Sequence, residues 1–300
     1  MRRNDESGQA LVFAVVFLVV LLGMAAAVLD VGSWYRAHRE LQATADAAAL
    51  AGAQALPEST SDASALASEY AQKNGGLSPD EISFSSDVVS DDTIKVHLSR
   101  PAPGFFAKVF GIDSVTVGGK ATARTGNPAQ ALYVAPMVVS ERHPKLKCKP
   151  LPCFGETTSL PYEPMGAPGG FGMLNLDGES GTVGTSNEAA WISKGFEKYL
   201  PLGLYQSDPG AKFSSSLLQG ALSRRIDSVL LFPVFRTLTG GGQNAEYDII
   251  GWVGFYLTGF TVQGNIATLN GYFTRFIATG IQSKSAGQRN FGVRSITLVG

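Results

Sequence analysis

The sequence predicts an α+β fold with one N-terminal transmembrane helix, and three observations lead to that prediction. Residues 10–29 form an apolar run without a charged side chain. Alanine-rich sequence follows it, so the helical pattern continues over residues 30–57. The remaining chain combines short helical patterns with alternating apolar strands and is rich in glycine, with 35 residues in 300. We therefore expect a single anchor followed by mixed α/β domains on one side of a membrane.

The run at residues 10–29 reads ALVFAVVFLVVLLGMAAAVL. As a helix it would be about 30 Å long, the hydrocarbon thickness of a bilayer. Residues 1–9 would then be a short cytoplasmic tail. A cleaved signal peptide is the alternative, because Arg2 and Arg3 precede the run and Ala25, Ala26 and Ala27 provide small residues for a cleavage site. The length of the run and its helical continuation favour a retained anchor.

Small residues recur along the predicted helix. Gly23 and Ala27 have the spacing that lets helices approach closely in lipid. Beyond the span, small side chains leave a slim helix against which partner helices could pack; a plain helical stalk explains the same composition. The predicted helix-packing positions are Gly23, Ala27, Ala45, Ala48, Ala49 and Gly52.

Three blocks in residues 8–56 occur in a distinctive order. Gly8-Gln9 opens the apolar run, Asp30-Val31-Gly32 closes it, and Leu41-Gln42 leads into the alanine-rich stretch. In these blocks the segment resembles the N-terminal part of TadE/TadG-like proteins of bacterial tight-adherence (Flp) pilus assembly and secretion systems. The resemblance implies a single-pass protein of the cytoplasmic membrane whose partners are other pilus or secretion-system subunits.

The resemblance has two departures. Processed pilin-like members carry a glutamate five residues after the cleaved glycine, and counting from Gly8 that position is Phe13. We therefore do not expect prepilin-type cleavage.

Longer members carry a von Willebrand A domain with an Asp-x-Ser-x-Ser metal site. The nearest match here, residues 62–66, lacks the second serine, so we do not assign that domain.

The charges that flank the apolar run give little information on the orientation of the helix in the membrane. Arg2 and Arg3 flank one side of the run and Arg36 and Arg39 the other, so the positive-inside bias is nearly balanced. The family resemblance and the cysteine pair favour the N-terminus inside and the C-terminal domains outside the cytoplasm.

Residues 62–126 are predicted to form a small α/β domain. A helix beginning near Ser61 or Asp62 would end at Asn74-Gly75-Gly76. Ile94, Val96 and Leu98 alternate with polar residues, the pattern of a half-buried strand. The expected elements are a helix to residue 73, strands at 82–89 and 93–99, a short helix at 105–110 and a strand at 114–124.

Residues 136–168 are rich in proline and are predicted to be a linker or long loop. Its two cysteines, Cys148 and Cys153, could form a disulfide if the intervening prolines turn the chain. Two reduced thiols are the alternative. A zinc site with His143 is a further one, although no fourth Cys or His lies nearby to complete four ligands.

Residues 170–300 are predicted to form an aromatic-rich α+β domain. Gly264-Asn265 separates two long strand patterns, 247–262 and 266–277, which predicts a hairpin. In the first strand Ile249 and Val253 would face one side and Ile250 and Trp252 the other, so both faces should be covered. The other expected elements are helices at 189–199 and 214–226 and strands at 230–235 and 291–299.

No catalytic, metal-binding or cofactor-binding signature emerges. Lys plus Arg number 24 against 25 Asp plus Glu, which gives no electrostatic reason to expect nucleic acid. No phosphate-binding glycine motif is present, so no nucleotide is expected. His38, His97 and His143 occur in unrelated contexts.

The predicted function is a non-enzymatic, membrane-anchored component of a tight-adherence pilus or related secretion apparatus. Two alternatives remain: a membrane-tethered envelope hydrolase, and an anchored adhesin or carbohydrate-binding module that uses aromatics such as Trp191 or Trp252.

Overall fold

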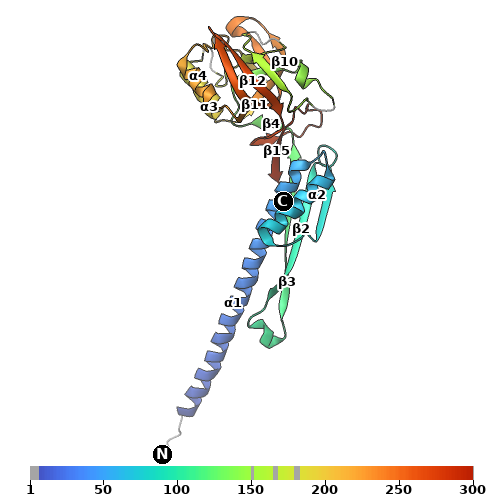
Figure 1. The fold of residues 1–300 in the computed structure, drawn as a ribbon. Coiled ribbons are helices and arrows are strands. Elements are labelled where there is room, and N and C mark those ends of the chain that lie inside the picture. The colour runs from blue at the N-terminus through green and yellow to red at the C-terminus, as the bar shows by residue number, and fades with distance from the viewer. Residues whose placement is uncertain (1–6, 150–151, 165–167, 179–182, 300) are drawn as a thin grey trace, which may run out of the picture. The chain divides into compact units, whose positions relative to one another are not determined.

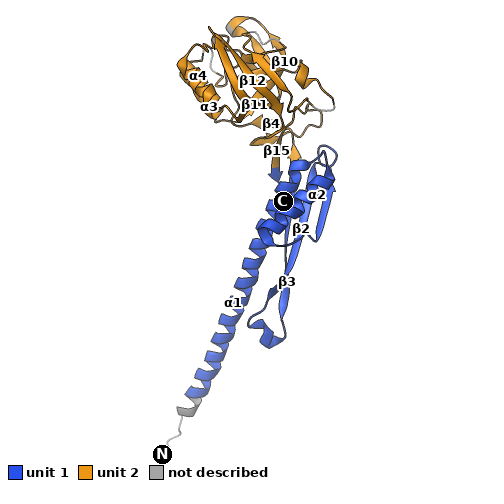
Figure 2. Cartoon of the chain, in the orientation of Figure 1, with its two compact units in different colours: residues 1–124, 297–300 blue, residues 125–296 orange. Residues whose placement is uncertain are grey.

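The computed structural model describes residues 7–149, 152–164, 168–178 and 183–299. The chain divides into two compact units, residues 1–124 with 297–300 (unit 1) and residues 125–296 (unit 2), shown in Figures 1 and 2. An N-terminal apolar helix followed by mixed helix and sheet confirms the α+β class. Most of the predicted tail, residues 1–9, lies outside the described residues.

Unit 1 is built on one long helix. Its elements are α1 (Ser7–Gly52), η1 (Ala53–Ala55), α2 (Thr60–Gly75), β1 (Glu81–Ser85), β2 (Thr93–Pro103), η2 (Ala107–Phe110) and β3 (Ser114–Gly126). The α2 boundaries follow from local chemistry: the Ser59 side chain accepts from the Asp62 N–H, and Gly76 adopts the left-handed conformation that ends the helix. Residues 62–66 therefore lie in α2.

The three strands of unit 1 form antiparallel pairs. β1 pairs with β2, and β2 pairs with β3 from Thr93 opposite Arg124 to Pro103 opposite Ser114. Ile94, Val96 and Leu98 of β2 are fully buried, as their alternation predicts. The helix over residues 30–57 belongs to this unit, whereas we expected the small domain to begin at residue 62.

Unit 2 contains most of the strands. They are β4 (Pro128–Ala131), β5 (Met137–Ser140), β6 (Thr157–Pro161), β7 (Phe171–Met173), β8 (Leu200–Pro201), β9 (Gly203–Gln206), β10 (Ser228–Thr239), β11 (Glu246–Gln263), β12 (Ile266–Thr274), β13 (Phe276–Ile277) and β14 (Gly280–Gln282). Its helical elements are η3 (Pro144–Leu146), α3 (Thr185–Lys194), α4 (Ser216–Ser223) and η4 (Gly242–Asn244). The last strand, β15 (Val293–Leu298), begins in unit 2 and ends in unit 1.

The main sheet of unit 2 has the order β6-β12-β11-β10-β5-β7, with β9 also paired to β11. The β11–β12 hairpin turns at Gly264, whose positive φ suits a glycine, as the sequence predicts. The last strand does not join this hairpin: Val293 and Arg294 of β15 pair with β13 instead.

Both faces of the main sheet are covered. One core includes Ile192 of α3, Leu218 of α4 and Phe255 of β11; the other includes Leu200 of β8 and Trp252 of β11. The pairing of β10 with β11 shifts register between Gly251 and Ile249. This bulge places Ile249 in the core that contains Trp252, so the strict alternation that put Ile249 beside Val253 is wrong.

The prediction of a linker at residues 136–168 is also wrong. β5 and β6 lie in this segment, and both belong to the main sheet. The prediction relied on the high proline content of this segment. Most of its prolines lie beside the strands, where the backbone N–H that proline lacks is not needed for strand pairing. Unit 2 consequently begins at residue 125 instead of residue 170.

Candidate functional site

Helix α1 changes character at Asp30. From Leu11 to Leu29 its large apolar side chains are exposed to solvent in the described chain, with Leu11 69% and Phe13 74% exposed. Asp30 is only 2% exposed, and Leu41, Ala45 and Ala48 that follow are buried. Within the described residues, α1 is the one helix long and apolar enough to cross a membrane.

The second half of α1 packs against α2. Ala45, Ala48 and Ala49 are completely buried, as are Ala63 and Ala67 of α2. At Gly52 an added Cβ would lie 2.6 Å from the Ile94 side chain and 2.9 Å from the Ala63 carbonyl oxygen. Small residues therefore serve close packing between two helices and a strand of the same unit.

This packing bears directly on the six predicted helix-packing residues. Ala45, Ala48, Ala49 and Gly52 contact their own unit, so our expectation that partner helices pack on them is wrong. Gly23 and Ala27 are different, because Gly23 has no neighbour within 4 Å for an added Cβ and Ala27 is exposed. These two positions remain free in the chain for contacts inside a membrane.

A ladder of side chains from α1 contacts the β2–β3 hairpin. The Trp34 indole N–H donates to the Pro103 carbonyl at 3.0 Å, and a His38 ring nitrogen lies 2.6 Å from the Gly118 carbonyl oxygen. Gln42 donates to the Lys120 carbonyl and accepts from the Lys120 N–H. Because the three residues are four apart, they lie on one face of α1 and fix the hairpin along it.

Asp30 completes this ladder one turn nearer the N-terminus. Its carboxylate oxygens accept backbone N–H groups of Phe105 at 2.9 Å, Phe106 at 3.0 Å and Ala107 at 2.5 Å. These N–H groups precede and begin η2, where a short helix leaves donors without intrahelical partners. In the sequence Asp30 is evident only as the residue that follows the apolar run. Its partners lie about 75 residues further on, and no local pattern reveals them.

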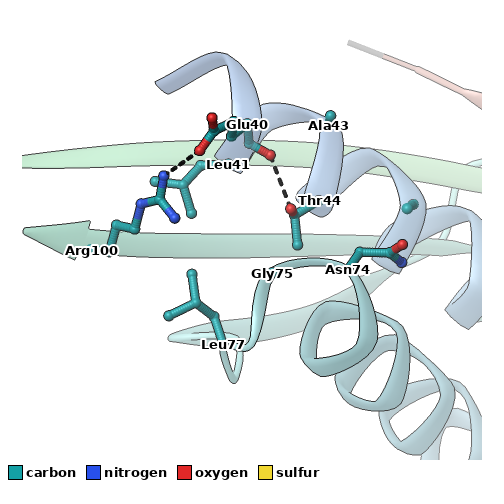
Figure 3. A pocket seen from close by; sticks show the side chains of 9 residues that line it. Glu40, Leu41, Ala43, Thr44, Asn74, Gly75, Leu77 and Arg100 are labelled. Atoms are coloured by element: carbon teal, nitrogen blue, oxygen red, sulfur yellow. Dashed lines mark hydrogen bonds and ion pairs between the residues drawn. The ribbon is translucent and has the colours of Figure 1, made fainter. Parts of the chain in front are cut away.

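A hollow of about 440 Å³ lies between α1, α2 and β2 (Figure 3). Arg100 of β2 donates to Glu40 of α1 at 2.6 Å on its rim, and the Thr44 hydroxyl donates to the Glu40 carbonyl oxygen. Leu77 and Gly75 complete the wall. The ion pair and these aliphatic groups connect the elements of unit 1, and they do not resemble a catalytic arrangement.

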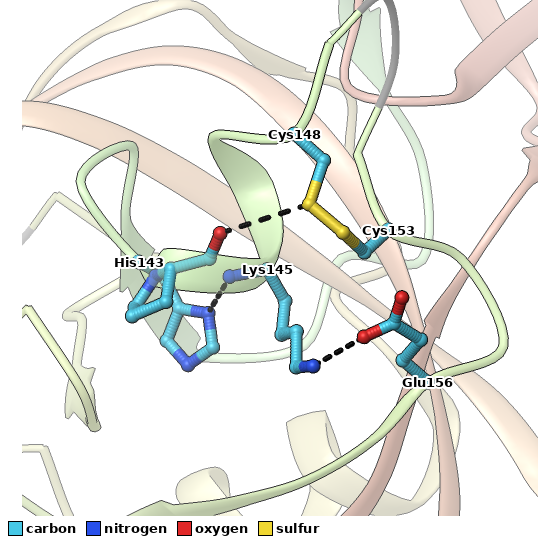
Figure 4. Close-up of a disulfide and its surroundings, with 6 residues drawn as sticks. His143, Lys145, Cys148, Cys153 and Glu156 are labelled. Carbon is cyan, nitrogen blue, oxygen red and sulfur yellow. Dashed lines mark hydrogen bonds and ion pairs between the residues drawn. A yellow bond between two sulfur atoms is a disulfide. The ribbon is translucent and has the colours of Figure 1, made fainter.

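In unit 2, Cys148 and Cys153 form a disulfide with Cα atoms 5.5 Å apart (Figure 4). The Cys153 N–H donates to the Lys145 carbonyl at 2.8 Å, and Lys145 forms an ion pair with Glu156. Both sulfurs are therefore committed to each other and not to zinc. His143 accepts from the Lys145 N–H, and its ring meets Phe273 edge-on. Burial, with the Lys145 charge, lowers the pKa of His143 and favours the neutral ring.

Unit 2 also contains a pair of buried carboxyl groups that no sequence pattern indicated. Glu188 of α3 and Asp208 are 2% and 1% exposed, and their carboxyl groups are close enough to interact electrostatically. Burial and the Asp208 charge raise the pKa of Glu188 to about 8, and burial raises that of Asp208. The pair thus holds a proton near neutral pH. It lies in the protein interior, closed to a polymeric substrate.

The aromatic residues considered for glycan binding are buried or half-buried. Trp252 is 2% exposed and its N–H donates to the Pro128 carbonyl at 2.9 Å. Trp191 is half-buried against Phe196. Among the described residues, no three His, Cys, Asp or Glu side chains lie together in a way that could hold a metal ion.

The comparison with protein families falls on the long helix. Residues 8–55 match the family model described as putative Flp pilus-assembly TadE/G-like. Curated proteins and solved structures gave no match. The matched segment coincides with α1 and η1, so it includes the apolar run, Asp30 and the small residues that pack on α2. The chain therefore carries a TadE/G-like pilus-assembly segment, and this segment is the helix on which unit 1 is built.

Proposed function

We propose that this protein is a non-enzymatic, single-span component of a tight-adherence pilus or related secretion apparatus in the bacterial cytoplasmic membrane. The observation that carries the proposal is the coincidence of the TadE/G-like segment with one continuous helix. Its first half exposes an apolar surface of membrane length, and its second half is the core of a folded unit. Such a helix joins a bilayer anchor rigidly to a domain outside the bilayer.

In this proposal the N-terminus lies in the cytoplasm, and the part of unit 1 that follows Asp30 lies outside it together with unit 2. The disulfide in unit 2 supports this orientation, because disulfides persist in oxidising extracytoplasmic compartments. The apolar residues of the span contact lipid and the anchors of other pilus-system subunits. Gly23 and Ala27 form the contact point, because both are exposed and small enough for close helix approach.

The experiment compares two single-cysteine variants in cells that express the pilus apparatus. In Ala27→Cys the thiol lies on the exposed face of the span, and in Ala48→Cys it lies in the core of unit 1. A thiol-reactive benzophenone attached to the introduced cysteine should, on illumination, insert into C–H bonds of neighbouring proteins and join Ala27→Cys to pilus-assembly proteins, which mass spectrometry identifies. Ala48→Cys should give none of these products. If Ala27→Cys stays monomeric while the pilus is assembled, the proposed partner contact is wrong.

The residues considered for the two alternative functions give them no support. For an adhesin, Trp252 is inside the core and Trp191 is half-buried. For a hydrolase, the paired carboxyl groups of Glu188 and Asp208 are buried.

A further inference from the structure

The loop that closes the β2–β3 hairpin carries an unusual concentration of exposed apolar side chains. Phe105, Phe106, Val109, Phe110 and Ile112 are 63%, 45%, 84%, 80% and 45% exposed. We call residues 105–112 the hairpin tip. Exposed apolar patches of this kind are rare on water-soluble surfaces and mark a surface that another apolar phase covers.

Unit 1 itself specifies where the tip lies along α1. Asp30 accepts the N–H groups of Phe105, Phe106 and Ala107, so the tip begins beside the last residue of the apolar run. Ala26, one turn closer to the N-terminus, is half-buried, whereas the other residues from 21 to 29 are exposed. The tip thus lies beside the end of the span.

Depth in the membrane follows from helix geometry. Ala10 and Asp30 are twenty residues apart, so the helix between them is about 30 Å long and matches the hydrocarbon thickness of a bilayer. Asp30 is then at the boundary between hydrocarbon and headgroups. The tip occupies the same level, where aromatic side chains are favoured. Lys108 has a flexible stem that lets its ammonium reach the headgroups.

The backbone of the tip suits contact with lipid. Three of its N–H groups are satisfied by Asp30, and the Ile112 N–H donates to the Ala107 carbonyl at 3.1 Å. The Gly111 N–H donates to the Lys108 carbonyl at 3.0 Å. A segment with satisfied donors avoids much of the cost of leaving water.

We infer that the hairpin tip enters the leaflet at the C-terminal end of the span, where Asp30 holds it beside α1, and that the lipid bilayer covers its apolar side chains. The protein thereby has two membrane contacts on one rigid unit, which restrict tilting of the anchor. The inference rests on the membrane span of the proposed function.

The test uses the full chain in phosphatidylethanolamine and phosphatidylglycerol vesicles with a polarity-sensitive fluorophore on a single introduced cysteine. The native cysteines are joined in a disulfide and do not take the label. Val109→Cys reports on the tip, Phe17→Cys on the span, and Val89→Cys on the turn at the opposite end of β2. Val89 is exposed, so it is the matched surface control.

Labels at positions 109 and 17 should emit at shorter wavelength than the label at 89. They should lose emission to doxyl-labelled lipid and resist iodide present on both sides of the membrane. Position 89 should show the reverse. Asp30→Ala in the Val109→Cys protein should reduce lipid quenching at position 109 and leave it unchanged in the Phe17→Cys protein.

Three results would overturn the inference. Iodide access at position 109 equal to that at 89, with position 17 quenched by lipid, would leave the span intact and reject tip insertion. Protection from iodide without lipid quenching would show that protein covers the tip. Unchanged quenching in Asp30→Ala would reject the role of Asp30. Loss of lipid quenching at position 17 would instead refute the membrane span itself.

Discussion

At the scale of single residues, Gly119 of β3 lies against the backbone of α1. An added Cβ would come within 2.6 Å of the Leu41 carbonyl carbon and 2.8 Å of the Gln42 nitrogen. Neither atom belongs to a flexible side chain, so the helix and strand would have to separate. Gly118 next to it has more room, with the His97 ring 3.4 Å from the added Cβ.

We therefore expect Gly119→Ala to destabilise the protein by about 1–3 kcal/mol, the usual cost of overpacking. Gly118→Ala is the matched control and should cost clearly less. Denaturant unfolding of the full chain in detergent measures both. Equal stability of the two variants would show that α1 does not approach β3 as closely as described.

The buried pair of Glu188 and Asp208 predicts how stability depends on pH. The pKa of Glu188 is about 8 in the folded protein, above its ordinary value of 4.5. The folded state therefore binds a proton that the unfolded state releases between these values. The resulting stabilisation is complete below about pH 4.5 and is lost as pH rises through about 8.

Glu188→Gln keeps the uncharged shape at every pH, so its stability relative to the parent should increase as pH rises over this range. Thermal unfolding in a pH series measures the difference. Parallel curves for the two proteins would contradict the shifted pKa.

At the scale of elements, the disulfide closes a loop between η3 and β6. The bridge restricts the unfolded chain, and for so short a loop its loss should cost about 2 kcal/mol. We expect the exported protein to react with maleimide, after denaturation, only when first reduced. Cys148→Ser should leave one reactive thiol, at Cys153. Full reaction of the parent without reductant would contradict the bridge.

Elements with local signals could be predicted from the sequence. The α2 caps, the alternation in β2 and the turn at Gly264 each depend on a few neighbouring residues. Contacts between distant segments could not. β5 and β6 join the main sheet through partners far along the chain, and the bulge in β11 depends on its register with β10.

In the candidate site, too, the features with a local signal could be predicted and the contacts between distant segments could not. The apolar run and the TadE/G-like blocks were evident in the sequence, and the family match confirms the resemblance. The burial of Ala45 and Ala48 by α2 and the bonding of Asp30 to the hairpin were not evident, because alanine packs equally well on partners inside or outside the chain. Composition alone does not distinguish these partners.

At the scale of the whole molecule, the orientation of the anchor determines on which side of the membrane the chain after Asp30 lies. We expect alkaline phosphatase fused after residue 300 to be active, because the enzyme folds only in an oxidising compartment. A cytoplasmic reporter at the same position should be inactive. The reverse pattern would place the chain after Asp30 in the cytoplasm.

The central claim is that residues 10–29 remain part of the mature protein and stay embedded in the bilayer. Mass spectrometry of the protein from washed membranes and from culture medium tests it most directly. The account predicts an intact N-terminal apolar segment in the membrane fraction and none of the protein in the medium. A mature chain that begins just after Ala27 and is free in the medium would contradict it.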